Sequence, residues 1–179
     1  MVALVAALLL LAGCSRSEPP DAAGTTPVPS PGAGPWDQRE RAVYREAIRE
    51  LEKYEARNQR FLAAGKATRA AKRFYQQHLR DWESSYAQLQ QYEREGIRIA
   101  RAPVVLSSEP VFIQAFQDNA ADVVVLRCTD QSDLGMTQDG TPLPAVHEQP
   151  VVQEVDVRRY ENLVWRIGTF ETTGSPCAR

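Results

Sequence analysis

The spacing of apolar side chains changes near the middle of this chain, and that change constrains the fold more than any other feature. Up to about residue 96 the larger apolar residues recur every three or four positions, as one face of an amphipathic helix requires. Beyond that point the chain is rich in Val, Ile and Phe and contains alternating stretches, which are typical of β-strands. Helices followed by antiparallel strands predict an α+β domain, with N-terminal helices packed on a curved antiparallel sheet.

Two helical patterns lie in the first half. The first covers 36–58, where Glu and Arg occupy the face opposite the apolar residues. After a break expected near Gly65, the second pattern runs over 67–89. Gly96 is its expected C-terminal stop, because glycine is favoured just beyond a helix end.

The second half predicts a sheet of about four strands, made of two hairpins. The first hairpin turns at 118–121, Asp-Asn-Ala-Ala, and the second at Glu161-Asn162. The residues between the hairpins, 129–150, are rich in Gly, Pro, Asp and Gln and predict a long loop, a place to look for function or mobility. The four strand segments are 103–117, 122–128, 151–160 and 163–172.

An apolar run precedes this domain and ends in Leu11-Ala12-Gly13-Cys14. The run has about a dozen residues, whereas a helix that crosses a membrane needs about twenty, so we interpret 1–13 as a signal peptide. Its last four residues resemble the lipobox of bacterial lipoproteins, although no Lys or Arg precedes the run. We therefore expect Cys14 to become the lipidated N-terminus, anchored at the extracytoplasmic face of the cell membrane. A buried apolar helix or strand is the alternative, which the Pro-rich segment that follows disfavours.

The segment 14–35 contains mainly Ser, Pro, Gly, Thr and Ala without an apolar period, which predicts a disordered tether. The remaining residues, 36–179, are enough for one domain with a real core. We expect its helices over about 36–96 and its sheet over about 97–174.

Two cysteines, Cys128 and Cys177, are left once Cys14 carries lipid. Outside the reducing cytosol such an even pair normally forms a disulfide. A redox or metal pair is the alternative, but neither cysteine has a Cys-x-x-Cys neighbour or a His at ligand spacing. We expect the bridge to hold the C-terminal tail.

The order of the elements carries a resemblance to a known family. Helix, helix and hairpin are followed by four short motifs, Cys128-Thr129-Asp130-Gln131-Ser132, Asp139-Gly140, Leu163-Val164-Trp165-Arg166-Ile167 and Gly174-Ser175-Pro176-Cys177. In this order they resemble a group of actinobacterial lipoproteins of the nuclear-transport-factor-2-like superfamily, whose cystatin-like α+β domains are cone-shaped. The resemblance covers about 36–179 and implies a conical cavity between a long helix and the concave sheet. Members use that cavity for isomerase, dehydratase or cyclase chemistry, for ligand binding, or only as a scaffold or dimerisation fold, so the fold does not settle the function.

An enzyme of this kind needs a carboxylate or His deep in an apolar pocket. His78 could be such a base, or it could be a histidine at the edge of the core that is bonded to a neighbouring backbone group. Asp130 could be an acid at the cavity mouth, or it could, with Ser132, cap the turn that follows its strand. We favour the structural alternative for both. Five aromatic residues could line the cavity or simply belong to the core, which we favour: Trp82, Tyr86, Phe112, Phe116 and Trp165.

Charge and motifs exclude other classes. The net charge is −2, with a mildly basic helical half and an acidic sheet half, so nucleic acid is not an expected partner. No Gly-rich phosphate loop, nucleophile elbow, zinc spacing or calcium loop occurs in the sequence, so we expect neither cofactor nor metal. The favoured hypothesis is a non-catalytic, lipid-anchored binding domain for a small apolar ligand or a cell-envelope partner. A cavity enzyme and a scaffold or homodimerisation module are the alternatives.

Overall fold

The computed structural model describes residues 36–177, apart from the side chains of 169 and 174–176. The expected signal peptide, the lipobox residues Leu11, Ala12, Gly13 and Cys14, and the tether lie outside the described residues. Among the described helices none is both long enough and apolar enough to cross a membrane.

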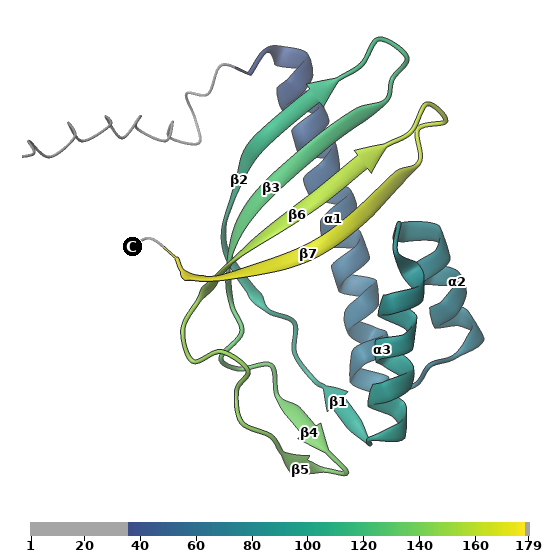
Figure 1. Cartoon of the computed structure of the whole chain (residues 1–179), viewed down its shortest axis with the longest axis vertical. Helices are drawn as coiled ribbons and strands as arrows, with labels where there is room; N and C mark the ends of the chain where they lie inside the picture. The colour runs from purple at the N-terminus through teal and green to yellow at the C-terminus, as the bar shows by residue number, and fades with distance from the viewer. Residues whose placement is uncertain (1–35, 178–179) are drawn as a thin grey trace, which may run out of the picture.

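The first predicted helix is confirmed as α1 (Gln38–Ala64), which runs along one face of the main sheet (Figure 1). It begins with a reciprocal cap, because the Asp37 carboxylate accepts from the Glu40 N–H at 2.8 Å and the Glu40 carboxylate accepts from the Asp37 N–H at 2.9 Å. It ends at Gly65, whose φ of 59° is the left-handed conformation that glycine adopts without strain.

The second predicted helix is wrong as a single element, because the structure divides it into α2 (Arg69–His78) and α3 (Trp82–Arg94). The division has a tertiary cause. Leu79 is extended and forms a parallel bridge with Ile167, and the Arg80 N–H donates to the Ile167 carbonyl at 2.9 Å. A strand edge therefore takes the backbone groups that would have continued the helix.

The main sheet has four antiparallel strands in the order β2-β3-β6-β7, and both predicted hairpins are confirmed (Figure 1). Its strands are β2 (Val104–Ala115), β3 (Ala121–Asp130), β6 (Val151–Arg159) and β7 (Trp165–Pro176). Strict alternation in β3 sets which face is covered, since every second residue from Ala121 to Thr129 is buried. Together with Val43, Ala47 and Leu51 of α1, that face forms the core.

A second, three-stranded sheet lies beyond the C-terminal end of α1, in the order β1-β4-β5 (Figure 1). Its strands are β1 (Ile97–Ile99), β4 (Met136–Gln138) and β5 (Thr141–Pro142). The prediction of a structureless loop over 129–150 is therefore wrong in part. Strands of two and three residues are too short to show a period, which is why the sequence pattern missed them.

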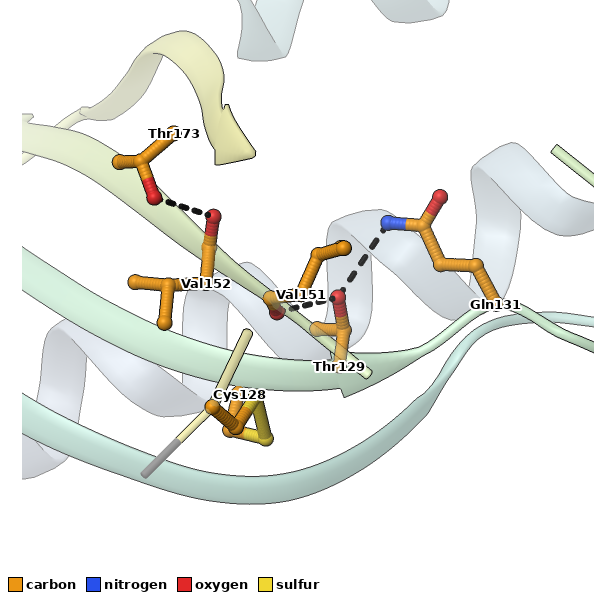
Figure 2. Close-up of a disulfide and its surroundings, with 7 residues drawn as sticks. Cys128, Thr129, Gln131, Val151, Val152 and Thr173 are labelled. Atoms are coloured by element: carbon orange, nitrogen blue, oxygen red, sulfur yellow. Dashed lines mark hydrogen bonds between the residues drawn. A yellow bond between two sulfur atoms is a disulfide. The ribbon is translucent and has the colours of Figure 1, made fainter. Parts of the chain in front are cut away.

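The expected disulfide joins Cys128 to Cys177, with their Cα atoms 5.7 Å apart. Figure 2 shows it beside the end of β3, where the Thr129 hydroxyl donates to the Val151 carbonyl at 3.4 Å. The Cys177 N–H also donates to the Pro150 carbonyl at 3.3 Å. The bridge thus attaches the last described residue to the central strand of the sheet.

Replacing both bridged cysteines, Cys128→Ala with Cys177→Ala, should lower the free energy of unfolding by about 4 kcal/mol, because the bridge closes a loop with a sequence separation of 49. Urea unfolding under oxidising conditions measures the loss. The wild-type protein after reduction should match the variant. If the variant were less stable than reduced wild type by as much as it is less stable than oxidised wild type, the cysteines would stabilise the fold by packing and not through the disulfide.

Candidate functional site

The second half of α1 and the helix α3 enclose a cavity of about 260 Å³ against the inner face of the sheet. Residues of α1 reach it at helical spacing, because Tyr54, Asn58 and Leu62 are each four positions apart. On the sheet side it is lined by Gln153 of β6 and Phe170 of β7. The cavity exists where polar Asn58 and Gln153 replace the aliphatic residues that fill the rest of this interface.

Tyr54 supplies a hydroxyl to the cavity wall, whereas the buried side-chain polar atom that lacks a hydrogen bond within 36–177 is Arg127 Nε. The residue is only 4% exposed, and its ring stacks on Phe74 and Phe170 at centroid distances of 5.3 and 6.0 Å. No hydrogen bond joins its hydroxyl to another residue within 36–177. Burial raises the pKa of Tyr54 far above its usual value of 10, so the group stays a neutral donor. The hydroxyl is accessible from the cavity, so a ligand with an acceptor oxygen can take the hydrogen bond that water would otherwise accept.

Two further tyrosines of the wall are also neutral. The Tyr75 hydroxyl donates to Asn58 Oδ1 at 2.8 Å, and burial raises the pKa of Tyr75 to about 12. The Tyr92 hydroxyl accepts from Gln88 Nε2 at 3.0 Å, and burial is the main cause that raises the pKa of Tyr92. The cavity therefore presents phenol groups, not phenolates, at neutral pH.

The carboxylate of the cavity wall, Glu55, is bound to a buried arginine. Arg127 lies on the inner face of β3 with its side chain 3% exposed, and both of its terminal nitrogens donate to Glu55, one of them at 2.9 Å. The Glu55 side chain is 31% exposed. Because both carboxylate oxygens accept from Arg127, the charge of Glu55 is matched by that guanidinium and the side chain is fixed against β3.

A second hollow lies at the other end of α1 and is open to solvent. This cleft has a volume of about 1140 Å³ and lies between the α2–α3 junction and the turns of both hairpins. It is lined by Trp82, Phe116 and Tyr160 and by several arginines, such as Arg80 and Arg158. The arginines are held within the protein, since Arg80 pairs with Asp156 at 2.6 Å and Arg158 with Asp122 at 2.5 Å.

The proposed base His78 lies outside both hollows. It is half-buried at the end of α2, with its ring 4.7 Å from that of Phe74. Burial, and then the charge of Arg57, lowers the pKa of His78, so the imidazole is neutral at pH 7. The structure places His78 at the edge of the core, as the favoured alternative expects, but the expected hydrogen bond to a backbone group is absent among the described residues.

Asp130 caps a turn. Its carboxylate accepts from the Ser132 N–H at 2.9 Å, and hydrogen bonds from Ser132 lower the pKa of Asp130. Asp130 therefore caps the turn that follows β3, as the favoured alternative expects, and it does not line the cavity.

The five aromatic residues that could line one cavity lie in different places, and the favoured interpretation as core fits Trp82, Tyr86 and Trp165, which pack against the core. Trp82 and Phe116 line the open cleft, whereas the Tyr86 hydroxyl donates to the Ala67 carbonyl at 2.9 Å beside the core. Trp165 packs against the core under Arg159, whose guanidinium carbon is 5.3 Å from the ring centroid. Phe112 is 43% exposed, because it follows a register shift in β2 and pairs with Val124, outside the buried set of β3.

The residues that line the cavity were not singled out by the sequence. By sequence, Tyr54 falls on the apolar face of the helix predicted over 36–58, and Gln153 alternates on the same side of its strand as Val151, Val155 and Val157. A polar residue within an otherwise apolar face is the signal that points to them. Asn58, one turn after Tyr54, repeats that signal on the helix.

The chain matches no protein-family model, and a search of curated proteins finds no match either. Within residues 36–177, no group of three or more His, Cys, Asp or Glu side chains is placed to hold a metal ion.

The two partners of the Glu55–Arg127 pair should not be equivalent in stability. Glu55→Gln leaves a buried guanidinium without its counter-charge and should lower the free energy of unfolding by about 3 kcal/mol. Arg127→Met leaves a carboxylate that water already reaches, so its loss should be clearly smaller. Urea unfolding of both variants measures the difference, and equal losses or the reverse order would contradict the assigned burial.

Proposed function

We propose that this protein is a lipid-anchored, extracytoplasmic binding domain that holds a small, neutral and mostly apolar ligand in the cavity beside Tyr54. The observation that carries the proposal is the Tyr54 hydroxyl, which lines a cavity of mixed apolar and polar residues, is accessible from it and has no hydrogen-bond partner among the described residues. Ligand sites combine mainly apolar walls with a few convergent polar groups, as this cavity does.

The chemistry of the wall selects the ligand class. Tyr54 and Tyr75 are neutral at physiological pH, and the charge of Glu55 is matched by Arg127. An ionised ligand would lose its hydration without a free counter-charge, whereas a neutral molecule with a carbonyl or ether oxygen can accept from Tyr54. The size also fits a small molecule, because an apolar cavity of about 150 Å³ already binds benzene and this one is larger.

Binding is better supported than catalysis. An isomerase or dehydratase needs a base with a free lone pair in the cavity. Glu55, the one carboxylate among the described residues that line the cavity, is held in an ion pair with Arg127, and His78 and Asp130 lie away from the cavity wall. The enzyme hypothesis therefore remains second.

The proposed fold family and anchor rest on separate observations. A long helix along one face of a four-stranded antiparallel sheet, with a cavity between them, supports membership in the nuclear-transport-factor-2-like superfamily of cone-shaped domains. The Leu-Ala-Gly-Cys motif after a short apolar run supports lipidation of Cys14. The Cys128–Cys177 bridge supports export, since disulfides persist in oxidising compartments.

Tyr54→Phe should weaken the binding of 2-acetylnaphthalene about fivefold, because one neutral hydrogen bond contributes about 1 kcal/mol. Binding of 2-ethylnaphthalene, which has a similar shape without the carbonyl, should not change. Isothermal titration calorimetry of the full chain measures both affinities.

The matched control is Tyr86→Phe, which removes the same atom from a tyrosine outside the cavity whose hydroxyl is held by Ala67. It should leave both affinities unchanged, and the charged analogue 2-naphthoate should bind neither variant nor wild type. Equal weakening of the two naphthalenes by Tyr54→Phe would contradict the hydrogen bond. Failure of wild type to bind either one would contradict the cavity as a ligand site.

A further inference from the structure

The turn between β6 and β7 exposes apolar side chains at one end of the molecule. Leu163 is 60% exposed, Tyr160 is 42% exposed and Val164 is 39% exposed. Tyr160 and Val164 also form part of the rim of the open cleft. Exposed apolar side chains gathered at a hairpin tip are typical of a contact surface.

The turn is held rigidly in a conformation that an apolar residue rarely adopts. Leu163 has a φ of 63°, in the left-handed region that glycine and asparagine favour. Three hydrogen bonds fix the turn, from the Tyr160 N–H to the Val164 carbonyl at 3.0 Å, from the Leu163 N–H to the Tyr160 carbonyl at 2.8 Å, and from the Val164 N–H to Asn162 Oδ1 at 3.2 Å. A leucine with a strained backbone and an exposed side chain contributes little to the stability of the domain itself, which suggests that it contacts another molecule.

This tip lies at the end of the domain where the chain from Cys14 arrives. Figure 1 shows the start of α1 beside the ends of the hairpin strands. Contacts agree, because Arg39 near the start of α1 donates to the Phe116 carbonyl in the first hairpin turn, and Glu46 pairs with Arg159 at the end of β6 at 2.5 Å. The residues that line the cavity are on the other half of α1.

We infer that the β6–β7 tip inserts Leu163, Tyr160 and Val164 into the interface of the lipid bilayer to which the protein is anchored. This inference rests on the proposed lipidation of Cys14. The expected tether joins the domain at this end and keeps it within reach of the membrane surface, and Tyr with aliphatic neighbours is the chemistry that headgroup regions accept.

The net charge near the tip decides whether the membrane contact is electrostatic or apolar. Three arginines near the tip are paired with carboxylates, Arg80 with Asp156, Arg158 with Asp122 and Arg159 with Glu46. A fourth, Arg166, donates to the Gln76 carbonyl, and the exposed Glu161 of the turn offsets its charge. They leave little excess positive charge to attract anionic lipid. The contact is therefore apolar, and phosphatidylcholine alone suffices for it.

The test labels one residue of the full lipidated chain with the fluorophore NBD through an introduced cysteine, Leu163→Cys. That thiol is the single free one when Cys14 carries lipid and Cys128 is bridged to Cys177. The control is Val146→Cys, because Val146 is similarly exposed at 57% but lies beside Pro142 of the three-stranded sheet, at the far end of α1. Both proteins are reconstituted into phosphatidylcholine vesicles, with and without phosphatidylglycerol.

We expect blue-shifted emission from the Leu163 label, quenched by nitroxide-bearing lipids, and water-like emission from the Val146 label. Phosphatidylglycerol should leave the shift unchanged. Vesicle flotation separates the two proposals, since lipidated protein should float and Cys14→Ser protein should float poorly. Flotation with a water-like Leu163 label would overturn the tip contact alone. Flotation that does not depend on Cys14, or no flotation at all, would overturn the anchor and the tip contact with it.

Discussion

The packing of α1 on the inner face of the sheet is the interaction on which the rest of the structure depends. Val43, Ala47 and Leu51 meet the alternating buried residues of β3, and this interface holds most of the core. The same helix then continues past the core and carries Tyr54 and Asn58 into the cavity. The helix α1 packs on the core with its first half and lines the cavity with its second half. The packing that stabilises the fold therefore also fixes the position of the cavity wall.

Polar contacts between α1 and the sheet occur along both halves of the helix, and among the described residues Arg127 Nε is the buried side-chain atom left without a hydrogen bond. Arg127 is neutralised by Glu55, and Tyr75 is held by Asn58. The Tyr54 hydroxyl is the exception among the described tyrosines of the wall that burial keeps neutral, since Tyr92 is also engaged. An apolar surface with one directional donor discriminates by the presence of an acceptor oxygen, which is a stronger filter than shape alone.

The sequence predicted the elements that depend on residues close together in the chain. It did not predict the features that depend on contacts between distant residues. Period and capping chemistry predicted α1, its end at Gly65, both hairpins and the two faces of β6. The break at Leu79 could not be predicted from its own helix, because it depends on Ile167, far along the chain. The cavity could not be predicted either, since Asn58 and Gln153 come from different halves of the sequence and gain meaning only when α1 lies on β6.

The account's central claim is that the cavity beside Tyr54 holds a small neutral molecule in an exported protein. Native mass spectrometry of the protein purified from its own cell envelope tests that claim most directly. We expect an acylated, disulfide-bonded chain that loses the mass of a small neutral molecule when it is denatured. An identical mass before and after denaturation, even after purification without detergent exchange, would contradict the ligand, and free thiols at Cys128 and Cys177 would contradict the export on which the account relies.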